Sequence, residues 1–126
     1  MMALNILKTA STPKVTFNNE LQTLSLIGRS FPENAREFYS PIIDWMKANT
    51  EQFSEKLILE VNLEYYNTAS SKFLMEIFHL LESFIEEKKI DVLIKWFYMS
   101  DDEDMKDAGE EYKQFIHIPF ECIEFE

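Results

Sequence analysis

Three hydroxyl side chains stand close together in the segment Asn67-Thr68-Ala69-Ser70-Ser71, between stretches with different hydrophobic periods. A serine or threonine at the first turn of a helix suits phosphorylation, because free backbone N–H groups and the positive end of the helix dipole favour an anion there. The phosphate adds about two negative charges, which change what a partner protein can bind. The same residue types also cap helices, and Asn67 suits the N-cap position. The residues by themselves therefore leave a phosphorylation site and a plain helix cap both open.

A second unusual segment, Gly28-Arg29-Ser30-Phe31-Pro32-Glu33-Asn34, combines a glycine, a basic residue and the capping-box spacing of Ser30 and Glu33. If the strands that precede the two segments run parallel, their carboxyl ends meet at one edge of the sheet. Arg29 would then lie near Thr68 and could meet a phosphate or an acidic partner. A cap and turn without any binding role explains the same residues equally well.

The acidic run Asp101-Asp102-Glu103-Asp104 has the residue types that bind divalent cations. A calcium loop of the EF-hand type needs glycine at its sixth position, where this chain has Lys106. Carboxylates also stabilise the first turn of a helix, so we favour a solvated helix start over a metal site and assign no metal ligand. A metal- or small-molecule-binding domain remains an alternative function.

Residue patterns typical of catalysis are missing from the sequence. Neither His79 nor His117 is arranged with Cys122, the only cysteine, as a base with a nucleophile. The chain contains two glycines, Gly28 and Gly109, so it cannot form a glycine-rich phosphate loop. We expect a protein that is not an enzyme and uses no cofactor.

Length and composition limit the class of protein. The 126 residues fit one domain, expected over residues 1–126, and 46% of them are hydrophobic, which is enough for a core. A formal net charge of −11 repels nucleic acid and anionic lipid, so neither is an expected partner. A single cysteine, with no signal-peptide pattern and no long apolar run, favours the cytoplasm.

Hydrophobic periods predict the elements that position these residues. Strands are expected in the opening segment 1–7, in a hairpin at 15–17 and 24–27, and at 57–66, 92–98 and 116–125. Helices are expected from the Ser30 capping box through Met46 with a break near Ser40 before Pro41, from the Thr68 segment to Lys88, and from Asp101 to Phe115.

Two strands carry more specific expectations. Period two over 57–66 places Tyr65 with the buried side chains and Tyr66 with the polar ones. The nearly continuous apolar run 92–98 is typical of a central strand that is covered on both faces. The element order predicts a single small α/β domain, with a mixed, mostly parallel sheet of about five strands and three helices. This order is similar to that of anti-sigma factor antagonist (STAS-like) domains, where a serine or threonine at the start of the second helix is phosphorylated.

Several separated blocks, spanning nearly the whole chain, resemble the SiaC family of regulatory phosphoproteins. The blocks are Thr12-Pro13, Gly28 to Asn34, Phe38-Tyr39 with Pro41 and Trp45, Leu63 to Lys72, and Trp96-Phe97-Tyr98 with Asp101 to Met105. The chain departs from the family pattern at Phe31 and Ala69, and neither departure touches the Thr68 hydroxyl.

The resemblance implies that Thr68 is the phosphorylated residue, that a Ser/Thr protein kinase adds the phosphate and that a PP2C-like phosphatase removes it. It also implies that the unphosphorylated form binds and activates a bacterial diguanylate cyclase, promoting cyclic-di-GMP synthesis and biofilm growth, and that phosphorylation breaks this contact. An anti-sigma factor antagonist in a partner-switching pathway is the first alternative. The partner-binding candidates around Thr68 are Arg29, Ser30, Glu33, Asn34, Asn67, Ser70, Ser71 and Lys72.

Overall fold

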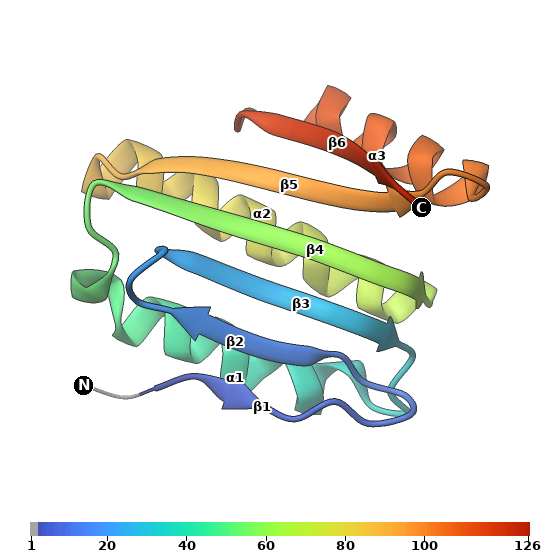
Figure 1. Cartoon of the computed structure of the whole chain (residues 1–126). Coiled ribbons are helices and arrows are strands. Elements are labelled where there is room, and N and C mark those ends of the chain that lie inside the picture. Colours follow the sequence, from blue (N-terminus) through green and yellow to red (C-terminus); the bar gives the residue numbers. More distant parts are fainter. Residues whose placement is uncertain (1–2) are drawn as a thin grey trace.

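In the part of the chain that the structure describes, six strands form one sheet, and three α-helices connect the parallel strands (Figure 1). The computed structural model describes residues 3–126. The elements are β1 (Asn5–Ile6), β2 (Lys14–Asn18), β3 (Thr23–Ser30), α1 (Ala35–Ala48), the short 3₁₀ helix η1 (Thr50–Gln52), β4 (Lys56–Tyr66), α2 (Thr68–Lys88), β5 (Asp91–Met99), α3 (Glu103–Phe115) and β6 (Phe120–Phe125).

The strands lie in the sheet in the order in which they occur along the chain. β1, β2 and β3 pair antiparallel, and β3, β4, β5 and β6 pair parallel, which confirms the mixed, mostly parallel sheet. The sheet has six strands where about five were predicted, because the opening segment, expected as a strand, also pairs into this sheet as β1, with Asn5 opposite Thr16. Met1 and Met2, the first residues of that predicted strand, lie outside the described residues.

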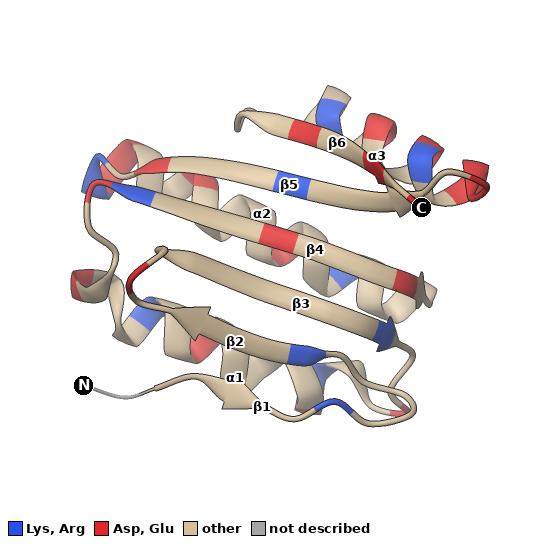
Figure 2. Ribbon diagram, viewed as in Figure 1, with Lys and Arg blue, Asp and Glu red and all other residues tan. Residues whose placement is uncertain are grey.

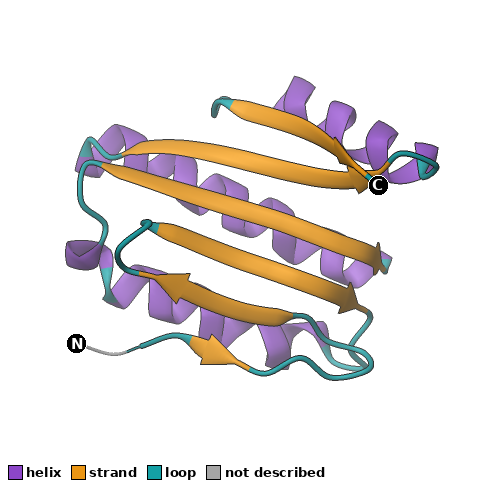
Figure 3. Ribbon diagram, viewed as in Figure 1, coloured by secondary structure: helices purple, strands orange, loops and turns teal. Residues whose placement is uncertain are grey.

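All three helices cover the same face of the sheet (Figure 3). Parallel strands joined by right-handed crossovers place their helices on one side when every new strand is added in the same direction. β5 is therefore buried on one face only, and the prediction of a central strand covered on both faces was wrong. Trp96 lies buried under the helices, whereas Phe97 points to the opposite, open face and is partly exposed. β5 lies next to the edge strand β6.

The first helix begins later than predicted and is not broken. Ser30 is the last residue of β3, and Asn34 caps α1 by accepting a hydrogen bond from the backbone N–H of Glu37 at 3.1 Å. Pro41 lies inside the helix, where it removes one backbone hydrogen bond. The helix continues through this defect because its apolar face, which includes Ile42, is buried against the core on both sides of the proline.

The second helix follows the predicted period closely. Its buried face consists of Ser70, Leu74, Ile77, Phe78, Leu81 and Phe84. Each fully buried aliphatic or aromatic side chain contributes roughly 1.5 to 3 kcal/mol relative to exposure. α2 is thus held along its whole length, and its first turn is fixed at the carboxyl edge of the sheet.

Candidate phosphorylation and docking site

The first turn of α2 lies beside the loop that leaves β3. The Asn67 side chain accepts a hydrogen bond from the backbone N–H of Ser70 at 2.9 Å, which confirms Asn67 as the N-cap. The backbone N–H of Asn67 also donates to the carbonyl oxygen of Ser30 at 3.0 Å. The two segments singled out in the sequence therefore meet at the carboxyl edge of the sheet, as predicted for parallel strands.

Ser70 anchors this turn to the core. Its Oγ atom lies 2.8 Å from Ser30 Oγ and donates to the Ser30 carbonyl oxygen at 3.1 Å. Ser30 Oγ in turn lies 2.5 Å from the Tyr39 hydroxyl on α1. Burial raises the pKa of Tyr39, so its phenol stays protonated. Both serines are completely buried, so they position the helix and present no surface to a partner.

The other two hydroxyls of the cluster differ in their surroundings. Ser71 is partly buried, and its Oγ lies 2.7 Å from the hydroxyl of Tyr112 on α3. Burial is also the main reason that the pKa of Tyr112 is raised. Thr68 is exposed to solvent at the first position of the helix. Of the three hydroxyls, Thr68 is the one that is accessible without displacing a buried contact.

The anchoring role of Ser70 gives a stability prediction. Ser70→Ala should lower the free energy of unfolding by about 1 to 3 kcal/mol, because it removes the two hydrogen bonds that Ser70 Oγ forms with buried groups of Ser30. Urea denaturation followed by circular dichroism measures this change. Lys72→Ala, a change at an exposed position two residues further along α2, is the control and should stay within about 0.5 kcal/mol of wild type. Equal stability of the two variants would contradict the anchoring role.

A β-bulge changes which tyrosine faces the core just before this turn. The register of β3 and β4 shifts by one residue after Gly28. Tyr65 is 49% exposed and contacts Phe31 edge-on, with ring centroids 5.9 Å apart. Tyr66 instead packs edge-on against the buried Trp96. The predicted phase was wrong at these two positions, because a bulge adds one residue and reverses the alternation beyond it.

Arg29 lies on the open face of the sheet. Its guanidinium stands 5.4 Å from the centre of the Phe31 ring, and its Nε atom lies 4.0 Å from Glu64 Oε2. Both charged side chains are more than a third exposed, so this ion pair contributes little to stability. Glu33, Asn34 and Lys72 are also exposed at this end of the molecule.

A groove of about 250 Å³ separates the first turns of α2 from α3. It is lined by Tyr66, Ser71, Met75, Ala108, Glu111, Tyr112 and Phe115. Ser71 and Met75 follow Thr68 at helical spacing, so the three residues share one face of α2. This groove was not predicted from the sequence, because its two walls are distant in the chain. A phenylalanine at the last position of α3, next to the polar Lys113 and Gln114, was the available signal.

The acidic run begins α3 as expected. Asp102 accepts a hydrogen bond from the backbone N–H of Met105 at 3.0 Å and is the N-cap, while Glu103 and Asp104 fill the first turn. Figure 2 shows acidic residues, in red, at the start of α3, near the carboxyl ends of β4 and β5. Within residues 3–126, no three His, Cys, Asp or Glu side chains are placed to hold a metal ion.

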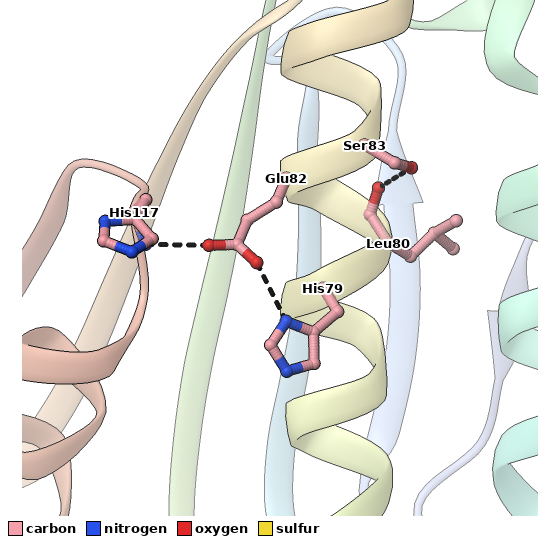
Figure 4. Close-up of polar contacts among 5 residues, drawn as sticks. All are labelled: His79, Leu80, Glu82, Ser83 and His117. Carbon is pink, nitrogen blue, oxygen red and sulfur yellow. Dashed lines mark hydrogen bonds and ion pairs between the residues drawn. The ribbon is translucent and has the colours of Figure 1, made fainter.

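Glu82 links α2 to the segment before β6 (Figure 4). One carboxylate oxygen lies 2.8 Å from His79 Nδ1, and the other accepts the backbone N–H of His117 at 2.8 Å. Burial is the largest influence on the pKa of Glu82 and acts upward. The hydrogen bonds and the two histidines together outweigh burial, so the pKa lies below its ordinary value of 4.5. Both histidines thus take part in a structural contact.

This depressed pKa predicts a pH-dependent stability. The ionised Glu82 stabilises the fold fully above pH 4.5, and that contribution is lost as the pH falls through the lower folded-state pKa. Glu82→Gln should therefore cost about 1 kcal/mol at pH 7 and progressively less below pH 4.5. Thermal unfolding of both proteins between pH 7 and pH 3.5 measures the difference. A Glu82→Gln deficit that stays constant over this pH range would refute the linkage.

None of the helices in the described residues has the length and hydrophobicity needed to cross a membrane.

Comparisons with known proteins agree over nearly the full chain. The sequence profile of the family described as "SiaC family regulatory phosphoprotein" matches residues 6–125. An uncharacterized protein of Pseudomonas aeruginosa strain UCBPP-PA14 is 32% identical over 120 residues, covering 95% of this chain and 94% of that protein.

Solved structures give the same result. The crystal structure of apo-SiaC from Pseudomonas aeruginosa superposes with a TM-score of 0.85 at 32% identity, covering 98% of this chain and 99% of that one. A chain in the crystal structure of the diguanylate cyclase SiaD in complex with its activator SiaC, from the same species, has a TM-score of 0.84 at 30% identity, with 97% and 99% coverage.

Proposed function

The chain belongs to the SiaC family of regulatory phosphoproteins, and from this premise we propose that it is a non-catalytic signalling protein switched by phosphorylation at Thr68. The unphosphorylated form binds a diguanylate cyclase and raises its synthesis of cyclic-di-GMP. A Ser/Thr protein kinase adds the phosphate and a PP2C-like phosphatase removes it. The switch operates in the cytoplasm and controls biofilm growth or aggregation.

The exposure of the three clustered hydroxyls carries the proposal. Ser70 is completely buried and Ser71 is engaged with Tyr112, whereas Thr68 is exposed at the first position of a 21-residue helix. A kinase needs its acceptor hydroxyl to leave the protein surface and enter another active site. This requirement favours Thr68 over its two neighbours on physical grounds.

A phosphate on Thr68 would be tolerated locally. It would stand at the positive end of the α2 dipole, where an exposed anion gains on the order of 0.3 to 1 kcal/mol. The same charge would cost a bound partner more, since about two negative charges would have to be desolvated in the contact. Modification would therefore leave the domain folded and change what it binds.

Reconstitution with a purified diguanylate cyclase from the same organism tests the proposal. Cyclic-di-GMP formed from GTP is measured by liquid chromatography, with the cyclase alone, with the unmodified chain and with the Thr68-phosphorylated chain. The unmodified chain should raise the rate, the phosphorylated chain should not, and the chain alone should form no product. An unchanged rate with the unmodified chain would refute the proposal.

A further inference from the structure

We propose that the groove between α2 and α3 is the docking site of the partner, and that it receives an amphipathic helix bearing an aliphatic anchor residue and a nearby lysine or arginine. This inference rests on the proposed function and adds the surface and the chemistry of recognition. Four observations support it: the apolar lining, the two parallel walls, an unpaired carboxylate and the position of Thr68.

The lining of the groove is largely apolar and ends in an exposed aromatic ring. Met75 and Ala108 contribute from opposite walls, and Phe115 at the end of α3 is 63% exposed. A volume of about 250 Å³ accommodates one or two aliphatic side chains. Exposed aromatic and methionine side chains are typical of the buried centre of protein interfaces. An apolar anchor residue would cover surface that the isolated chain leaves in water.

Both walls are faces of helices. Ala108, Glu111, Tyr112 and Phe115 share one face of α3, at spacings of three and four residues. α2 and α3 both start at the carboxyl edge of the sheet and run back along the same face (Figure 1). Two helices in this arrangement form walls that an amphipathic helix can lie between, with its anchors spaced one turn apart.

The charge of the groove selects the partner. Glu111 is exposed in the α3 wall, and among residues 3–126 it forms no ion pair. It lines the groove together with Tyr66 and Tyr112, and after burial its negative charge is one of the influences that raise the pKa values of these two tyrosines. A lysine or arginine on the docking helix would form an ion pair with this carboxylate, and its aliphatic stem would pack against the tyrosine rings.

Thr68 stands where modification would obstruct this docking. It lies on the same face of α2 as Ser71 and Met75, one turn before the lining residues. A phosphate there would have to lose its water when a helix docked across it. The partner's lysine or arginine would not offset that desolvation cost, because its charge is already paired with the Glu111 carboxylate. The groove thus connects the phosphorylated residue to the bound partner.

The open face of the sheet is the competing surface. Met99 is 43% exposed there, and the rings of Phe97 and Phe125 lie 6.5 Å apart. All three helices lie on the other side of the sheet (Figure 3), and Thr68 begins one of them, α2. The experiment below separates the two surfaces.

Binding is measured by isothermal titration calorimetry with the purified full-length diguanylate cyclase used in the reconstitution. Phe115→Ser should raise the Kd by roughly tenfold or more, since it removes an exposed anchor. Glu111→Lys should weaken binding to a similar extent by repelling the expected cation. Leu21→Ser is the matched control, because Leu21 is 68% exposed in the turn before β3, at the opposite edge of the sheet. It should bind as wild type.

Each outcome bears on one claim. Loss of affinity in Phe115→Ser and Glu111→Lys, with Leu21→Ser unchanged, supports the groove. Wild-type affinity in both groove variants overturns the groove proposal, and weakening by Met99→Ser instead assigns docking to the open sheet face. In that case the phospho-switch still stands. If the wild-type chain binds no cyclase, the proposed function fails and the groove proposal fails with it. Circular dichroism of each variant confirms that the fold is retained.

Discussion

Thr68→Glu is expected to raise the Kd for the cyclase by tenfold or more, while the free energy of unfolding stays within about 0.5 kcal/mol of wild type. The carboxylate would stand at the positive end of the α2 dipole, so the isolated chain accommodates it. In the complex, the same charge would have to be desolvated in the contact surface. Calorimetric titration and urea denaturation measure the two quantities.

The control for this prediction is Thr68→Gln, which has the shape of the glutamate variant without its charge. Glutamine should weaken binding much less than glutamate, because the expected effect is electrostatic. Equal affinities of the two variants would show that bulk at position 68 matters and charge does not. Thr68→Ala should bind as wild type and resist the kinase. Incorporation of phosphate into Thr68→Ala would place the modified residue elsewhere.

Gly109→Ala is expected to destabilise the fold by about 2 kcal/mol, although alanine normally stabilises a helix by about 1 kcal/mol relative to glycine. Gly109 lies buried in α3 against Trp96. A Cβ atom at position 109 would come within 2.8 Å of Trp96 Nε1, and closer still to Cδ1. Trp96 is completely buried, and its Nε1 donates to the carbonyl oxygen of Met105 at 2.9 Å, so the ring cannot move aside freely. Steric overlap therefore outweighs helix propensity.

The neighbouring position provides the control. Ala108→Gly should also destabilise, by about 1 kcal/mol, through the ordinary loss of helix propensity. Alanine is thus favoured over glycine at position 108, while glycine is favoured over alanine at position 109. Chemical denaturation of both variants measures the loss of unfolding free energy expected for each. A gain in stability for Gly109→Ala would contradict the close packing of α3 on Trp96.

Much of the architecture was predictable because it depends on local patterns. The period of α2, its Asn67 cap and the acidic start of α3 are properties of consecutive residues, and each was confirmed. Parallel pairing of β3 to β6 followed from the helices between the strands. The errors lie where contacts with an element distant in the chain determine the local structure. The Ser30 hydroxyl is taken into a buried contact with Tyr39 and Ser70, so it does not begin a helix.

The candidate site shows the same division. Local sequence placed three hydroxyls at a helix start, and the resemblance to a known family selected Thr68 among them. Burial then separated the three: Ser70 packs against Ser30, Ser71 reaches Tyr112, and Thr68 remains exposed. These distinctions depend on side chains about 40 residues away in the chain, which no local pattern encodes.

The sequence alone determined the class of fold, the position of the hydroxyl-rich turn proposed for phosphorylation, and the family to compare. Hydrophobic period and capping chemistry act over a few residues, so they can be read directly from the chain. The tertiary structure decided which hydroxyl is accessible, which way Tyr65 points and that a groove opens between α2 and α3. These features arise from the packing of separate elements, because the burial of a side chain depends on what the rest of the chain brings against it.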